Sequence, residues 1–196
     1  MIYIISNEKN SYELLTYDHD SSPDYSLFFE GTKLDGLGAP LNYQVNKKSD
    51  IQKLKQFHLI RSTGPDLVSD SLRKVIEQIA PSEVEFLDVC IRYKDEPING
   101  FSCINPLEKI PCVDMEQSEY KQTNFDPANP DFSFYYTLLL PEFPSSMQIA
   151  RCAEQPTLIV GGEKVKAACI AANLKGLTFC RAVDLTPHNR TACERI

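Results

Sequence analysis

Hydrophobic residues in the first third of the chain occur in short runs that polar and glycine-rich segments separate. The runs MIYII, YELLTY and YSLFF are divided by SNEKN, DHDSSPD and GTKLDGLGAPLN. Short apolar runs bounded by Asn, Asp, Ser, Pro and Gly are typical of β-strands joined by turns. We therefore expect a strand-rich N-terminal part over residues 1–60 and an α+β domain over residues 61–196.

The hydrophobic pattern changes to a helical period after Leu67. In LVSDSLRKVIEQIAP the apolar residues recur every three to four positions, Ser69 or Asp70 can serve as the N-cap, and Pro81 follows the end. This pattern predicts a helix at about residues 70–80. The next segment, VEFLDVCIRYK, is rich in β-branched and aromatic residues and predicts a strand.

The same order of strand, helix and strand returns near the C-terminus in TLIVGGEKVKAACIAANLKGLTFCRAV. Val68 corresponds to Val160 and Leu72 to Val165, so the two copies are offset by 92 to 93 residues. Solenoid repeats are shorter and need at least three copies. We therefore expect a duplicated strand-helix-strand unit, a mixed or mostly antiparallel sheet, and a second main helix at about residues 161–173.

Acidic residues outnumber basic residues, 27 to 20, which gives a net charge of -7. This charge disfavours binding to the phosphate backbone of nucleic acids and favours a basic protein partner. The apolar runs are far shorter than the roughly 20 residues that span a bilayer, and MIYIISNEKN lacks the pattern of a secretion signal. We expect a cytoplasmic protein that binds neither nucleic acid nor membrane.

Seven cysteines form no CxxC pair, and an odd number cannot all pair within one chain. Without a secretion signal we expect reduced thiols. Cys90 and Cys169 lie among apolar residues, where a free cysteine behaves as a small buried hydrophobe. We favour this structural role over a metal or redox role.

No spacing typical of catalysis or of metal binding is found along the chain. GFSCI lacks the second glycine of a GxSxG elbow, and IVGGEKVK lacks a complete phosphate-binding pattern. His19, His58 and His188 are scattered. The alternative that stays open is an enzyme whose site assembles only on folding, with His58 or His188 beside Cys152 or Glu119 in a deep pocket.

The segment CVDMEQSEY carries three carboxylates, those of Asp114, Glu116 and Glu119. It lacks the DxDxDG pattern of a calcium loop. Alternation of these acids with Val113 and Met115 favours a short extended segment that enters a turn and directs its carboxylates into solvent. We interpret it as a solvated or partner-facing acidic edge rather than an acid/base or cation site.

Several of these segments, in this order, resemble the bacterial polymorphic-toxin immunity family typified by a Myxococcus immunity protein. INP at residues 104–106 stands where the family has Leu-Asn-Val, and KGLTF at 175–179 matches its Gly-Leu-x-Phe. Asp114, Ser118 and Tyr120 stand in its acidic segment with Ser-x-Tyr.

The chain also departs from the family pattern at two places. Gly161 and Gly162 replace a second Ser-Asp helix cap, and the aromatic residues expected before Asn105 are reduced to Phe101. These differences bear on a shared binding edge more than on the fold. The resemblance covers about residues 65–183.

The resemblance implies a non-enzymatic protector, without cofactor or metal, that binds and blocks a cognate toxin. An acidic surface would steer such a protein towards a basic toxin. Buried aromatic side chains dominate the energetics of many interfaces. The expected contact residues are Asp114, Glu116, Glu119, Tyr120, Asp126, Asp131, Tyr135 and Tyr136.

Overall fold

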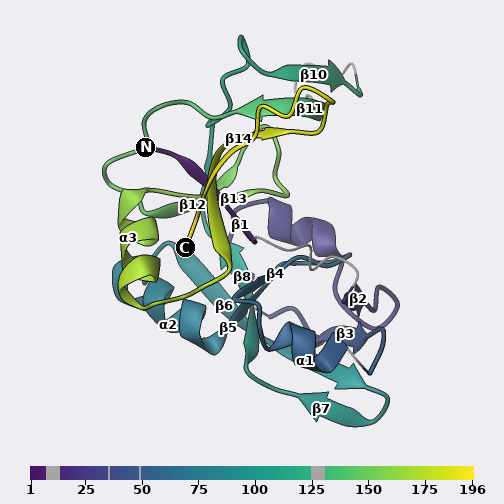
Figure 1. The fold of residues 1–196 in the computed structure, drawn as a ribbon. Helices are drawn as coiled ribbons and strands as arrows, with labels where there is room; N and C mark the ends of the chain where they lie inside the picture. Colours follow the sequence, from purple (N-terminus) through teal and green to yellow (C-terminus); the bar gives the residue numbers. More distant parts are fainter. Residues whose placement is uncertain (8–13, 35, 49, 125–130) are drawn as a thin grey trace.

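The computed structural model describes residues 1–7, 14–34, 36–48, 50–124 and 131–196. Within these ranges the chain forms an eight-stranded and a seven-stranded sheet and three short α-helices (Figure 1). The helices are α1 (Asp50–Leu54), α2 (Asp70–Ile79) and α3 (Glu163–Ala171), and a 3-10 helix, η1, spans Tyr25–Phe29. The prediction of a strand for YSLFF is wrong, because the side chain of Asp24 accepts a hydrogen bond from the backbone N–H of Ser26 and caps this 3-10 helix. This architecture confirms the predicted α+β class.

The eight-stranded sheet has the order β10-β11-β14-β1-β13-β12-β9, and β15 also pairs with β14. The pairs are antiparallel except that of β12 with β9. The strands are β1 (Tyr3–Asn7), β9 (Lys109–Ile110), β10 (Glu119–Gln122), β11 (Phe132–Leu138), β12 (Ile149–Cys152), β13 (Ile159–Gly161), β14 (Leu177–Asp184) and β15 (Ala192–Arg195).

The seven-stranded sheet has the order β2-β3-β6-β8-β5-β4, and β7 also pairs with β6. Here only β3 and β6 run parallel. The strands are β2 (Leu15–Tyr17), β3 (Leu41–Val45), β4 (Leu59–Ile60), β5 (Leu67–Ser69), β6 (Val84–Tyr93), β7 (Glu96–Ile98) and β8 (Phe101–Pro106).

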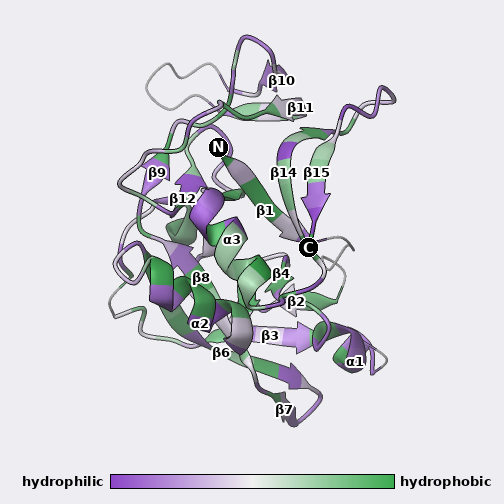
Figure 2. Ribbon diagram, turned by 60° about the vertical axis from the view of Figure 1, so that its left-hand side comes forward, coloured by the Kyte–Doolittle hydropathy of each residue, from purple (hydrophilic) through white to green (hydrophobic). Residues whose placement is uncertain are grey.

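The predicted duplication is present as β5-α2-β6 and β13-α3-β14. In the first unit, β5 and β6 lie on either side of β8 and antiparallel to it. In the second unit, β13 and β14 lie on either side of β1 in the same way. Each unit therefore encloses one strand from elsewhere in the chain, and α2 packs against α3 (Figure 2).

The first helix of the duplicated pair is capped as its sequence predicts. The side chain of Ser69 accepts a hydrogen bond from the backbone N–H of Leu72, and the buried face presents Leu72, Val75 and Ile76. The N-cap of α3 is Gly162, which has no side chain to provide the same bond. The predicted second helix at residues 161–173 is confirmed with slightly shorter bounds.

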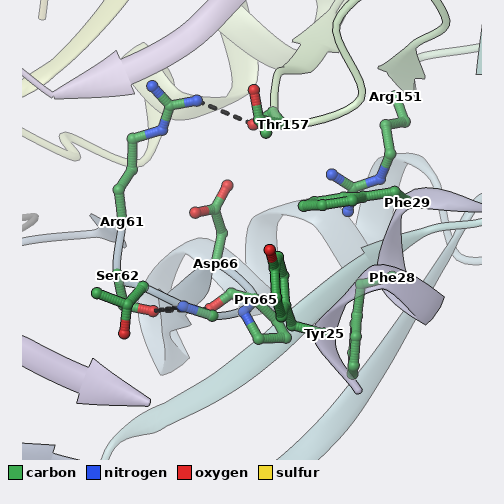
Figure 3. A pocket seen from close by; sticks show the side chains of 11 residues that line it. Tyr25, Phe28, Phe29, Arg61, Ser62, Pro65, Asp66, Arg151 and Thr157 are labelled. Atoms are coloured by element: carbon green, nitrogen blue, oxygen red, sulfur yellow. Dashed lines mark hydrogen bonds between the residues drawn. The ribbon is translucent and has the colours of Figure 1, made fainter. Parts of the chain in front are cut away.

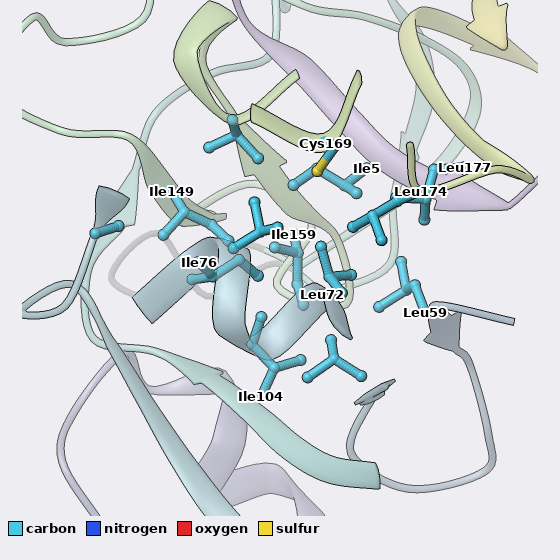
Figure 4. Packing of buried hydrophobic residues seen from close by; sticks show 14 of the residues in the cluster. Ile5, Leu59, Leu72, Ile76, Ile104, Ile149, Ile159, Cys169, Leu174 and Leu177 are labelled. Carbon is cyan, nitrogen blue, oxygen red and sulfur yellow. The ribbon is translucent and has the colours of Figure 1, made fainter. Parts of the chain in front are cut away.

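The main hydrophobic core lies between the two sheets and includes both duplicated helices (Figure 4). Ile104 comes from β8, Ile159 from β13, Leu72 from α2 and Cys169 from α3. Because each amphipathic element must bury one face, the two units cover each other's apolar surface. Ile5, Leu59, Ile76, Ile149, Leu174 and Leu177 belong to the same cluster.

The prediction that all seven cysteines are reduced is wrong for Cys180 and Cys193, which form a disulfide. These residues oppose each other across the antiparallel strands β14 and β15. Strand pairing brings them together, and their spacing in the sequence carried no sign of it. The other five cysteines are free. Cys169 is buried in the core as expected, whereas Cys90 on β6 is only half-buried.

Candidate functional site

The predicted acidic segment and the predicted aromatic strand lie side by side at one edge of the eight-stranded sheet. β10 is the edge strand and all its residues are exposed. β10 lies beside β11 in a hairpin (Figure 1), in which Glu119 pairs with Tyr136 and Tyr120 with Phe134. Folding thus gathers predicted contact residues from two separate parts of the chain. Asp126 lies outside the described residues.

Asp114 closes the turn that precedes β10. Its Oδ1 accepts hydrogen bonds from the backbone N–H groups of Glu116 and Gln117, at 3.1 and 3.0 Å, and its Oδ2 accepts one from Nε2 of Gln117 at 2.7 Å. Asp114 is therefore the first residue of this turn, and both of its carboxylate oxygens already accept hydrogen bonds within the turn. The side chain of Glu116 is exposed and makes no hydrogen bond or ion pair with any described residue.

Glu119 is held by an arginine that the sequence pattern did not single out. Nη1 of Arg190 lies 2.8 Å from Oε1 of Glu119, and its Nε donates to Oδ2 of Asp184 at 2.9 Å. The guanidinium also lies over the ring of Tyr136, 3.9 Å from its centroid. One side chain from the loop after β14 thus fixes residues of β10, β11 and β14 together.

Asp184 anchors this arrangement. Burial acts to raise the pKa of its carboxyl, but hydrogen bonds from Thr186 and Arg190 outweigh burial and hold that pKa well below its usual range. The carboxylate is therefore charged at neutral pH and keeps Arg190 in place beneath the edge strand.

Replacing Asp184 with asparagine is expected to lower the melting temperature at pH 7. Because the folded pKa lies below the unfolded value of about 3.9, the carboxylate stabilises the fold above that value and ceases to do so as pH falls through the folded pKa. Thermal unfolding of both proteins across acidic pH measures the difference. It should shrink towards low pH, and a constant difference would contradict the assignment.

The remaining predicted residues on the hairpin are accessible. Tyr120 and Tyr135 are 39% and 48% exposed. The ring of Tyr120 is supported by Phe132 and Phe134, at centroid distances of 5.2 and 5.5 Å. Asp131 is exposed, and its carboxylate has no partner among the residues described. Strand alternation separates exposed Tyr135 from Tyr136, which is half-buried beneath the guanidinium described above.

A cavity of about 390 Å³ lies elsewhere, between η1, the connection from β4 to β5, and the end of β12 (Figure 3). Tyr25 and Phe29 line one side, and the charged groups are Arg61, Asp66 and Arg151. None of these residues lies in a recognisable sequence motif. The only sign was the short segment RSTGPD, which combines turn formers with both charges.

Both arginines of the cavity are partly engaged by backbone carbonyl groups. Arg61 donates to the carbonyl of Thr157 at 2.9 Å, and Arg151 donates to that of Pro156 at 2.6 Å. The guanidinium of Arg151 also lies over the ring of Phe29, 5.7 Å from its centroid. These contacts hold positive charge at the wall of a cavity in a protein whose net charge is negative.

Asp66 lies between these two arginines in the cavity (Figure 3). Burial raises the pKa of its carboxyl, while the charges of Arg61 and Arg151 act in the opposite direction. Its carboxylate makes no hydrogen bond or ion pair with another described residue. The cavity can therefore accept a polar group, but its lining contains neither a histidine nor a cysteine among the described residues.

The residues of the alternative enzyme site are placed in different surroundings. Nδ1 of His58 lies 2.9 Å from Oγ of Ser69, and burial lowers the pKa of its imidazole. Cys152 is fully buried beside Cys112. In the described part of the chain the partner of Glu119 is Arg190, and the partner of Cys152 is Glu154. Neither is the histidine that a nucleophilic site requires.

Among the residues that the structure describes, no helix has the length and hydrophobicity needed to cross a bilayer. A search of curated proteins finds no match to this chain. The model of the immunity protein family Imm11 matches residues 42–184. This match runs from β3 to the end of β14 and includes both duplicated units, the segment of Asp114 and the β10-β11 hairpin. Since it covers 143 of 196 residues, the chain belongs to the Imm11 immunity protein family.

Proposed function

We propose that this protein binds a cognate antibacterial toxin in the cytoplasm and neutralises it by covering its active site or blocking access to substrate. Membership of the Imm11 family is the observation that carries the proposal. The toxin would be a secreted polymorphic or contact-delivered effector. The protein would act by forming a complex, without a reaction of its own and without a cofactor.

The contact surface that we propose is the β10-β11 hairpin with the turn before it. Glu116 and Asp131 supply exposed carboxylates without a partner among the described residues, and Tyr120 and Tyr135 supply exposed aromatic area. The other proposed contact residues are Asp114, Glu119, Asp126 and Tyr136. Asp114, Glu119 and Tyr136 also shape the surface from within, through the turn and through Arg190.

An edge strand suits this role because its outer backbone groups have no partner in the sheet. β10 ends the eight-stranded sheet, and polar residues Glu119, Lys121 and Gln122 make up most of it. Charged side chains on an edge discourage indiscriminate strand pairing. A specific partner is therefore favoured over an unrelated sheet edge, and the exposed carboxylates of Glu116 and Asp131 beside the strand favour a basic one.

Co-expression with the toxin encoded next to this protein tests the proposal. We expect the cells to survive and the two proteins to co-elute in gel filtration. Toxicity that persists at full expression of folded protein, with no complex on the column, would end the proposal. Turnover of a small compound by the purified chain, abolished by one side-chain change, would favour the enzyme alternative instead.

A further inference from the structure

A second cluster of reactive side chains lies at the opposite edge of the same sheet, where β9 pairs with β12. Cys112 follows β9, Cys152 is the last residue of β12, and Glu154 lies in the turn after it. The two sulfur atoms and a carboxylate oxygen of Glu154 all lie within 4.8 Å of one another. Both cysteines are fully buried and neither is in a disulfide.

The carboxylate of Glu154 turns inward to this pair although its residue is only half-buried. Its Oε2 accepts a hydrogen bond from the backbone N–H of Cys112 at 3.1 Å and one from Sγ of Cys152 at 3.4 Å. The same turn buries Oε1 of Gln155, which has no hydrogen-bond partner in the described part of the chain. The carboxylate of Glu154 thus contacts two cysteines of an otherwise hydrophobic cluster.

The spacing of these atoms is close to that of a metal site. With Zn–S distances of about 2.3 Å and Zn–O distances of about 2.0–2.2 Å, tetrahedral geometry places ligand atoms about 3.5–3.8 Å apart. Sγ of Cys152 and Oε2 of Glu154 are already 3.4 Å apart. The remaining separations need to close by about 1 Å at most to meet this geometry.

We propose that Cys112, Cys152 and Glu154 bind a thiophilic dication of the Zn²⁺ class. Water would be the fourth ligand, on the side where half-buried Glu154 is reached by solvent. On binding, both thiols release their protons to solvent and coordinate as thiolates. The proposal goes beyond toxin binding and does not depend on it.

The protonation of the thiols distinguishes the metal-free and metal-bound states. In the metal-bound state both cysteines are thiolates, which a dication stabilises directly. Because binding releases both thiol protons, metal affinity should increase with pH.

A bound metal would also have a mechanical consequence. Cys112 lies two residues before Asp114, and its carbonyl accepts a hydrogen bond from the N–H of Leu140 at 2.8 Å, just beyond the end of β11. Linking Cys112 to β12 would hold the base of the turn that leads to β10. A bound metal would thereby restrict the motion of the turn that carries the proposed contact surface.

Titration of the 196-residue protein with Cd²⁺, kept under argon so that the free thiols stay reduced, tests the site. We expect one equivalent to bind with a cadmium–thiolate charge-transfer band, and Zn²⁺ to displace it. Loss of an outer-shell partner typically lowers metal affinity about 10–100-fold, so Cys112→Ala and Cys152→Ala should each lower it at least that much. Glu154→Gln should weaken binding and leave the charge-transfer band in place.

The matched controls are Cys169→Ala, which removes another fully buried free thiol, and Cys90→Ala, which removes a half-buried one. Both should bind cadmium as the original protein does. Absence of the band in the original protein, or an unchanged band in Cys112→Ala, would overturn the proposal. If Cys152→Ala does not fold, Glu154→Gln and Cys112→Ala decide the question. Toxin rescue is scored separately, so failure of one proposal does not imply failure of the other.

Discussion

Replacing Phe179 with alanine is expected to lower the free energy of unfolding by about 3–5 kcal/mol. Its side chain is fully buried in the core between the two sheets, and its ring meets that of Tyr3 edge to face at a centroid distance of 6.1 Å. Truncation removes this contact and leaves a cavity at the junction of β1 and β14. Urea unfolding followed by circular dichroism measures the change.

Leu185→Ala is the control for this experiment because it truncates an apolar side chain that is 76% exposed. It should change the free energy of unfolding by no more than about 0.5 kcal/mol. Equal effects of the two substitutions would contradict the burial of Phe179. A Phe179→Ala transition with two separate steps would show that the two sheets do not share one cooperative core.

Reversing two charges of the proposed contact surface, in Glu116→Lys with Asp131→Lys, is expected to slow association with the toxin about tenfold at low ionic strength. Neither carboxylate has a partner in the described residues, so the fold should be unaffected. The rate of the variant should also depend less on salt, because screening acts on the attraction that has been removed. Stopped-flow or surface-based kinetics at several salt concentrations provide the measurement.

Asp88→Lys with Glu96→Lys provides the matched control. These exposed residues lie on β6 and β7, away from the hairpin, and reversing them changes the net charge equally. Their association rate should fall much less. If both double variants slow association to the same extent, net charge alone steers the toxin and the β10-β11 hairpin is not its contact surface.

The two main helices and the duplicated unit could be predicted because their signals are local, whereas α1 and η1 lie in the part expected to form strands. Ser69 as an N-cap, the apolar period through Ile76 and the recurrence of that pattern at Val165 depend only on neighbouring residues. The division of the chain at residue 60 stays a prediction. β1 is nevertheless enclosed by strands from the other end of the chain, between β13 and β14.

The candidate surface was predictable only in part. The acidic character of CVDMEQSEY and the aromatic character of the later strand are readable directly. The sequence does not show which of the acidic side chains remain unpaired. Asp114 accepts hydrogen bonds within its own turn, and Glu119 forms an ion pair with Arg190, which lies about seventy residues further along the chain. A side chain that the sequence pattern predicts to be a free charge can form an ion pair with a residue that is distant in the sequence and is brought near only by folding.

By itself, the sequence determined the α+β class, the two helices, the repeated unit and the acidic balance, since these follow from periodicity, capping and composition. Tertiary structure alone decided four further features: the pairing of Cys180 with Cys193, the arginine network beneath the edge strand, the charged cavity around Asp66, and the cluster of Cys112, Cys152 and Glu154. The physical reason is that each joins residues through strand register or loop closure, and such long-range contacts leave no period in the chain.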